Sequence, residues 1–225
     1  MRRSTGVWLI MFVSAALATG SSLAAYREMM PFIASGGTIE TKFEALSGGA
    51  IRPGLSFYSK KILLDDCNYS LNSFSILMLD EKLQDKIRQN CSAMASMIVD
   101  EAPTFSYAWY VRALASSSAD EPGTFEDALL WSQRTAPNQE DLAYYRAVLA
   151  YYNWSALAPA ARETLAADIV VSAHSNRGLA WLAGRYAEDE SFREVIIKAL
   201  EQAPADIQRR FLQTIAITSR PGPKT

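Results

Sequence analysis

The hydrophobic positions of this chain recur with the period of an α-helix. From residue 80 onward, apolar side chains follow one another at steps of four, four, three and four, which places them on one face of an amphipathic helix. They are Leu83, Ile87, Cys91, Met94 and Ile98. Similar patterns predict helices over residues 106–116, 124–135, 138–154, 160–173, 177–187, 191–202 and 205–217. No stretch alternates with a period of two, so the sequence predicts an all-α fold.

Before residue 80 the pattern is less regular. Glycine pairs at 36–37 and 48–49, and Pro53-Gly54, interrupt residues 26–54 and leave room for one short helix at 39–46. We interpret this interval as a connector between a membrane segment and the folded domain. Residues 55–64 favour a further short helix, and Asp65, Asp66 and Asn72 indicate a turn region that carries Cys67.

The N-terminus has the composition of a membrane-directed segment. Arg2 and Arg3 precede a run without charge that extends to Tyr26. A cleavable signal peptide would use the small residues 22–24 as its cleavage site. An uncleaved anchor would use residues 7–25, close to the roughly 20 residues that a helix needs to span a bilayer. Trp8 and Tyr26 stand at its two ends, where interfacial aromatic residues are common.

Both interpretations predict export of the remaining chain. The two arginines keep the N-terminus in the cytoplasm by the positive-inside rule. We therefore expect a single-pass protein of a bacterial inner membrane with a periplasmic C-terminal domain, or a periplasmic or secreted protein if the leader is cleaved. The expected order is a cytoplasmic N-terminus (1–6), the anchor (7–25), the connector (26–54), a helical domain (55–218) and a flexible tail (219–225).

Export changes the interpretation of the two cysteines. In an oxidising compartment Cys67 and Cys91 can pair and leave no odd thiol. The alternative is a pair of reduced cysteines that act as small hydrophobic side chains. We expect a disulfide that ties the region of Cys67 to the buried face of the helix that carries Cys91.

A short motif occurs twice, 34 residues apart. It consists of Ala-Pro followed by Tyr-x-Arg-Ala, and its copies are Ala102-Pro103 with residues 110–113 and Ala136-Pro137 with residues 144–147. A period of this size is the length of one helix–turn–helix repeat. The segment Trp109, Ala113 and Pro137 resembles a tetratricopeptide repeat, in which an aromatic residue, a small residue four positions later and a terminal proline define the unit.

This resemblance covers residues 102–154, about one and a half units, and implies a short array of helical hairpins. The chain departs from the pattern in the short second helix at 124–135 and in the absence of a third copy beyond Pro159. With the membrane segment, residues 134–137 and 153–159 are also similar to small membrane-anchored accessory proteins of bacterial exopolysaccharide synthesis and export. That resemblance implies an accessory role.

Aromatic residues crowd two of the predicted helices and surround two arginines. We interpret most of the rings as packing between helices. Tyrosine, tryptophan and arginine are also the residues that binding interfaces favour, and the first helices of a repeat array line its concave face. The residues that we expect to contact a protein partner are Tyr110, Arg112, Tyr144, Arg146 and Tyr151, and we expect the three tyrosine rings to be exposed.

Candidate catalytic residues are few. His174 is the only histidine, and its place at a helix end suggests an interaction with the helix dipole. Glu163 with Asp168, or Asp65 with Asp66, could in principle form a carboxylate pair for glycan cleavage. The sequence has no phosphate loop, dinucleotide fingerprint or zinc-ligand spacing, and we expect no catalytic residue, metal or cofactor.

A net charge of −2 also provides no basic surface for nucleic acid. We therefore expect a non-catalytic scaffold or adaptor, tethered to the membrane, that binds other components of a cell-envelope assembly, one that handles polysaccharide. Two alternatives remain open at this point. One is a carbohydrate-acting hydrolase that uses Glu163 or Asp168, and the other is a module that binds glycan directly through its tyrosines.

Overall fold

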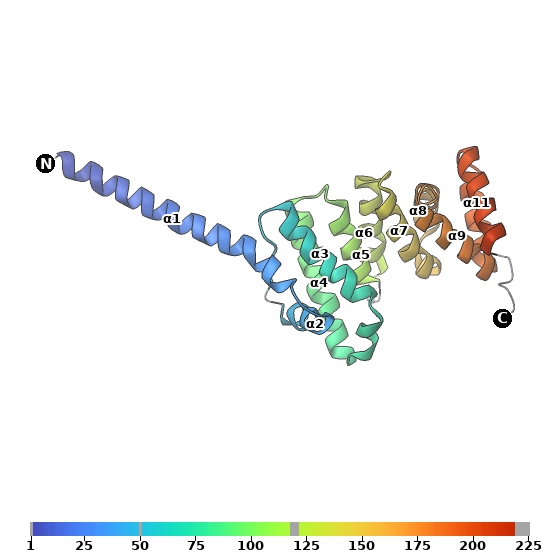
Figure 1. Ribbon diagram of the computed structural model, residues 1–225, viewed down its shortest axis with the longest axis horizontal. Helices are drawn as coiled ribbons and strands as arrows, with labels where there is room; N and C mark the ends of the chain where they lie inside the picture. Colours follow the sequence, from blue (N-terminus) through green and yellow to red (C-terminus); the bar gives the residue numbers. More distant parts are fainter. Residues whose placement is uncertain (1, 50, 118–121, 219–225) are drawn as a thin grey trace. The chain divides into compact units, whose positions relative to one another are not determined.

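The computed structural model of the chain describes residues 2–49, 51–117 and 122–218. Over these residues the fold contains α-helices, two short 3-10 helices and no strand, which confirms the predicted all-α class. The chain divides into two compact units, residues 1–101 and 102–225. The first unit contains α1 (Arg2–Ala34), α2 (Ile39–Gly48), α3 (Phe57–Asn72), η1 (Phe74–Met78) and α4 (Glu81–Glu101) (Figure 1).

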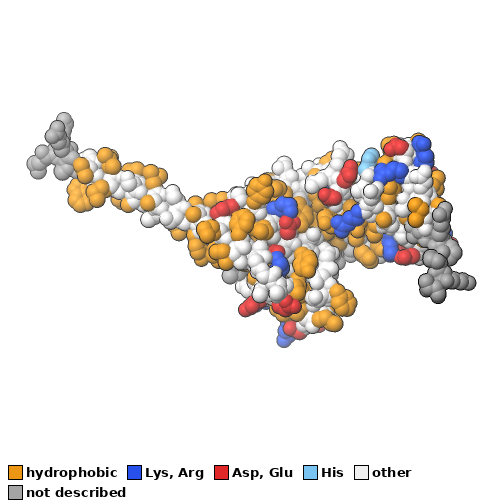
Figure 2. All heavy atoms as spheres, in the orientation of Figure 1, with side chains coloured by type: hydrophobic (Ala, Val, Ile, Leu, Met, Phe, Trp, Pro, Cys, Tyr) orange, Lys and Arg blue, Asp and Glu red, His pale blue; other side chains and the backbone are white. Residues whose placement is uncertain are grey.

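The N-terminal helix α1 is long and strongly apolar. Residues Gly6–Ala34 have the length and hydropathy of a membrane-spanning helix, a test that a signal sequence also passes. The first half of α1 extends away from α2–α4 (Figure 1), and hydrophobic side chains lie along its surface (Figure 2). Large apolar residues such as Phe12 and Leu17 are exposed. The helix continues past the predicted anchor at 7–25 to Ala34.

The interval that we interpreted as a connector is mostly helical. It contains the last turns of α1, which pack on α3, and the whole of α2, which packs on α3 and α4. Phe43 and Leu46 of α2 are buried. Lys42 of α2 forms an ion pair with Asp66 of α3, and its ammonium group also donates a hydrogen bond to the carbonyl oxygen of Ser35. Residues 39–48 are therefore part of the core of the first unit.

A disulfide joins α3 to α4. Cys67 and Cys91 are bonded, their Cα atoms lie 5.7 Å apart, and both side chains are completely buried. The predicted pairing is confirmed. The predicted turn around Cys67 is wrong, because α3 runs without interruption to Asn72. Leu63 and Leu64 on one side of Asp65-Asp66 and Cys67 on the other all face the core, so burial keeps the polar pair within the helix.

The second unit is built from successive helical hairpins (Figure 1). In the first two hairpins, α5 packs on α6 and α7 packs on α8. The helices α5 and α7 begin at Ser106 and Glu140, so the 34-residue repeat of the sequence is also a repeat of the structure. The helices are α5 (Ser106–Ser116), α6 (Pro122–Thr135), α7 (Glu140–Tyr152), η2 (Trp154–Ala156), α8 (Pro159–Ser172), α9 (Asn176–Glu188), α10 (Glu190–Leu200) and α11 (Ala205–Thr218).

Local signals fix the helices of the C-terminal half. Pro159 occupies the first turn of α8, where its missing N–H costs no hydrogen bond. Ser175 caps α9 by accepting a hydrogen bond from the backbone N–H of Gly178 at 3.0 Å. A Cβ atom at residue 178 would lie 2.0 Å from the carbonyl oxygen of Ser172, so only glycine allows α9 to approach the end of α8 this closely. Asp189 caps α10.

By residue type the sequence also suggests N-caps at Thr124, Asn138, Asn176 and Ser191, and at these four positions the structure differs. Asn138 does not cap α7, since the N-cap is Gln139 and has no side-chain hydrogen bond. Asn176 is the first residue of α9, and Ser191 lies inside α10. The α6 helix starts at Pro122, before the predicted cap at Thr124. Residues 219–225, predicted as a flexible tail, lie outside the described residues.

Candidate functional site

Arg146 lies at the centre of the second unit. Its Nε atom donates to Asp168 Oδ2 at 2.8 Å, and its Nη2 atom donates to Asp168 Oδ1 at 2.6 Å. Its remaining N–H groups donate to the carbonyl oxygens of Ser132 and Ala136, at the end of α6. Both charged side chains are completely buried. Arg146 therefore joins α7 to α8 and also to the preceding hairpin.

Burial and pairing act on Asp168 in opposite directions. Removal from water raises the pKa of its carboxyl above the ordinary value of 3.8, while the hydrogen bonds and the charge of Arg146 oppose that rise. The carboxylate is occupied on both oxygens by the guanidinium. It has no exposed surface on which to meet a substrate.

Tyr110 is also inside the molecule. Its ring is 2% exposed and lies between those of Tyr107 and Tyr145, at centroid distances of 6.1 and 5.6 Å. The expectation that this ring is exposed is therefore wrong. A ring on α5 that faces α7 fills the space between two first helices, where it contributes apolar burial as well as ring contacts.

Tyr144 and Tyr151 are half-buried in a network between α7 and α9. The guanidinium of Arg177 lies 4.2 Å from the centre of the Tyr144 ring, a favourable cation–π distance. The Tyr151 hydroxyl donates to Asp189 Oδ2 at 2.9 Å and accepts from Arg185. These partners hold the two rings in place against α9.

Arg112 occupies the position of the first repeat that matches Arg146. It is half-buried, and its guanidinium lies 5.4 Å from the Trp109 ring, which stacks on Trp131. Its Nε atom is buried without a hydrogen-bond partner. The residue 34 positions before Asp168 is Arg134, so the first repeat offers no acid where the second has one.

The five residues that we predicted to bind a partner are thus distributed over the interior and the half-buried surface. Arg146 and Tyr110 are enclosed, and Arg112, Tyr144 and Tyr151 keep part of their surface in solvent. The three tyrosines of this set, with two further tyrosines and with side chains of α9, form what we call the aromatic framework, which connects α5, α7 and α9. Its members are Tyr107, Tyr110, Tyr144, Tyr145, Tyr151, Trp181, Arg177 and Arg185.

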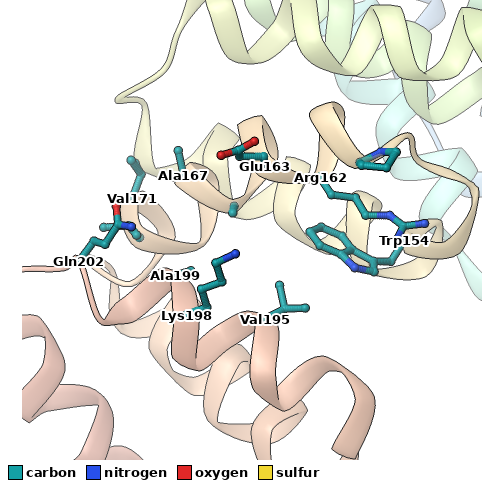
Figure 3. Close-up of a pocket in the computed structure, with 12 residues that line it drawn as sticks. Trp154, Arg162, Glu163, Ala167, Val171, Val195, Lys198, Ala199 and Gln202 are labelled. Carbon is teal, nitrogen blue, oxygen red and sulfur yellow. The ribbon is translucent and has the colours of Figure 1, made fainter.

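A groove lies between α8 and α10. It has a volume of about 710 Å³ and opens to solvent (Figure 3). We call the small apolar residues of α8 and α10 that line it the floor, and the other lining residues the rim. The floor is formed by Ala166, Ala167, Val170, Val171, Val195 and Ala199, and the rim by Trp154, Pro159, Arg162, Glu163, Lys198 and Gln202.

Two charged rim groups are available for a ligand. Within the described residues, Glu163 and Lys198 have no ion pair and no hydrogen-bond partner in the folded chain, and both are exposed. Glu163 extends from α8 and Lys198 from α10, with the ammonium group of Lys198 directed into the groove (Figure 3). At the other end the Arg162 side chain lies beside the Trp154 indole (Figure 3), and its Nη2 atom donates to the carbonyl oxygen of Ser155 at 2.9 Å. The groove thus offers an apolar floor with separate positive and negative groups above it.

The structure separates the carboxylates that we considered for catalysis. Glu163 lines the groove, whereas Asp168 is enclosed by Arg146. Asp65 pairs with Lys61, and Asp66 pairs with Lys42. His174 is exposed at the end of α8. Over the part of the chain that the structure describes, no three His, Cys, Asp or Glu side chains are grouped as a metal site would require.

The groove was not evident from the sequence. Its floor residues have the helical period of any apolar face, so only the distance between α8 and α10 distinguishes them from core. Lys198 is one of many surface charges in the sequence.

Comparison with protein-family models, with curated proteins and with solved structures finds no match for this chain.

Proposed function

We propose that the chain is a membrane-tethered, non-catalytic scaffold that binds a segment of a protein partner in the α8/α10 groove. The observation that carries this proposal is the groove itself, in which unpaired charges of both signs stand above an apolar floor. Small floor residues admit close approach of another backbone, as when a helix lies in a groove. The partner segment that fits has apolar residues on one face, an acidic group near Lys198 and a basic group near Glu163.

Three features support the tether and the compartment. Helix α1 is long and apolar enough to span a bilayer. A disulfide between α3 and α4 is typical of an oxidising compartment. The positive charges at residues 2 and 3 favour an N-terminus in the cytoplasm. The proposed location is a bacterial inner membrane, with the two helical units in the periplasm.

The hairpins of the second unit support a repeat-type scaffold. Two of them repeat at 34 residues, in keeping with a degenerate tetratricopeptide-like array. Arrays of this kind present extended binding surfaces to proteins. By its resemblance to accessory proteins of exopolysaccharide synthesis and export, the chain would bind a component of an envelope assembly that handles polysaccharide.

Co-purification of the full chain with its partner from membranes tests this function. Ala167→Trp fills the groove at an exposed floor position, and Ala187→Trp adds the same side chain at an exposed position of α9 outside the groove. We expect the first variant to lose the partner and the second to keep it. Retention of the partner by Ala167→Trp would place the binding surface elsewhere.

Two further experiments separate the scaffold from a glycan-binding module and from a hydrolase. Binding of the purified chain to polysaccharide without another protein would replace the scaffold by a glycan-binding module. Glu163→Gln keeps the shape of the rim residue and removes its acid. Loss of the cellular phenotype in that variant with partner binding intact would favour a hydrolase.

A further inference from the structure

Exposed apolar side chains gather where the end of α1 meets the start of α3. Leu55 and Phe57 are each 55% exposed and Tyr58 is 74% exposed. The neighbouring part of α1 is equally apolar on its surface, since Tyr26, Met29, Phe32 and Ile33 are all exposed. We call Tyr26, Met29, Leu55, Phe57 and Tyr58, which lie closest to the level of Glu28, the apolar collar. A collar of this kind is unusual on a surface that faces only water.

The α3 part of the collar is held against α1 by hydrogen bonds. Glu28 accepts from the backbone N–H groups of Leu55 at 2.7 Å and of Ser56 at 3.0 Å, and also from the side chains of Ser56 and Ser59. A Cβ atom at Gly54 would lie 2.7 Å from Glu28 Oε2, so the backbone approaches the carboxylate closely. Residues 54–58 therefore stay at the level of Glu28 along α1.

A second contact holds the same loop. The Nε atom of Arg27 donates to the carbonyl oxygen of Pro53 at 3.2 Å. Lys60, one turn into α3, pairs with Glu101 at 2.7 Å. Arg27 and Lys60 both pair with Glu101, while the apolar rings of Phe57 and Tyr58 remain exposed. The charged groups of this corner are thus neutralised by one another, and its exposed surface includes unpaired apolar rings.

If α1 spans a bilayer, the position of Glu28 along the helix sets its depth relative to the membrane. The anchor predicted from the sequence ends at Ala25, and three further residues of helix add about 4.5 Å. The headgroup region extends on the order of 5–8 Å beyond the hydrocarbon core on each side. Glu28 and the loop attached to it then lie within the headgroup region, where tyrosine and other aromatic side chains are favoured.

We propose that the apolar collar inserts into the headgroup region of the outer leaflet, so that the first unit is docked on the membrane surface. The inference rests on the proposed membrane tether of α1 and goes beyond it, because a tether alone would leave α2–α4 free in solution. The binding partner is the phospholipid bilayer. The exposed apolar residues Phe74, Leu77 and Met78 are outside the collar, because they follow the opposite end of α3, about 24 Å away for 16 residues.

Spin labels on the full chain in phospholipid nanodiscs test this docking. Labels are placed singly at Tyr58→Cys in the collar, at Leu17→Cys in the anchor and at Phe74→Cys as a matched exposed aromatic position. The native cysteines are bonded to each other and do not react. We expect the Tyr58 label to be more accessible to apolar oxygen than to a water-soluble nickel chelate, at a shallower depth than Leu17. The Phe74 label should show the reverse preference.

Three outcomes would overturn the proposal, and they are distinguishable. If the Leu17 label lies in the hydrocarbon and the Tyr58 label behaves like the Phe74 label, the anchor stands and the docking is wrong. If the Leu17 label is itself accessible to the chelate, the tether fails and the docking fails with it. Strong dipolar broadening between Tyr58 labels that disappears on dilution with unlabelled chain would show that a second copy covers the collar, and would also reject the proposal.

Discussion

Arg146 and Asp168 form a fully buried, two-point ion pair between the helices α7 and α8. A buried pair of this kind contributes little over an apolar pair of the same size, because desolvation offsets the attraction. Removal of one partner alone is costly, since the other charge then stays in the interior without compensation. The pair therefore makes specific predictions for single and double substitutions.

Arg146→Met should lower the free energy of unfolding of the second unit by about 3–5 kcal/mol. Arg146→Met combined with Asp168→Leu should recover most of this loss, although the carbonyl oxygens of Ser132 and Ala136 lose a donor. Denaturant unfolding followed by tryptophan fluorescence measures both, because four of the five tryptophans belong to the second unit. A double variant no more stable than Arg146→Met would contradict this account of the pair.

The equivalent substitution in the first repeat should have a smaller effect. Arg112→Met removes a half-buried guanidinium above the Trp109 ring, a contact that contributes about 0.5–1 kcal/mol at such sites. The same fluorescence experiment compares it with Arg146→Met under identical conditions. If both variants lost the same free energy of unfolding, the two arginines would have the same structural role, which would contradict the argument from their different surroundings.

Replacement of both cysteines should destabilise the first unit. The bond between Cys67 and Cys91 closes a loop with a sequence separation of 24. The chain-entropy treatment of cross-links assigns about 3 kcal/mol to a loop of this size. Hydrogen exchange of α3 and α4 amides should therefore accelerate in Cys67→Ala/Cys91→Ala, while exchange in α7–α8 serves as the control. Unchanged protection in α3 and α4 would show that packing alone holds these helices.

The helix cap at Asp189 predicts a dependence on pH. Hydrogen bonds from Ser191, from the Tyr151 hydroxyl and from the backbone of Phe192 lower the pKa of this carboxyl below its ordinary value of 3.8. A lowered pKa in the folded state means that the stabilisation is fully present above pH 3.8 and is lost as the pH falls through the folded pKa. Asp189→Asn keeps a capping side chain and should remove this part of the acid sensitivity in unfolding curves between pH 2 and pH 6. An identical acid response in the variant would reject the assignment.

The repeat and the cysteine pair were visible in the sequence because each depends on spacing along the chain. The helix α5 was predicted with its observed bounds for the same reason, since its apolar face and the following breakers are local signals. The disulfide needed one more assumption, the compartment, and the structure brings Cys67 and Cys91 together.

The roles of the repeat side chains were not visible in the same way. Because tyrosine and arginine are common at interfaces, the sequence suggested that Tyr110 and Arg146 contact a partner, but the structure buries both. Arg146 pairs with Asp168, which is 22 residues away in the next helix, and no local sequence pattern predicts this contact. The groove likewise depends on the spacing between α8 and α10, which the sequence does not encode in any short motif. In an array of helices, binding surfaces depend on the distances between helices in the folded chain.

Photo-crosslinking from the groove tests the central claim most directly. A photoreactive residue at Lys198, on the rim, is compared with one at Arg209, an exposed position of α11 outside the groove. The scaffold account predicts a protease-sensitive adduct from position 198, none from position 209, and loss of the adduct when Ala167→Trp is added. An adduct that survives Ala167→Trp, or equal adducts from both positions, would contradict the account.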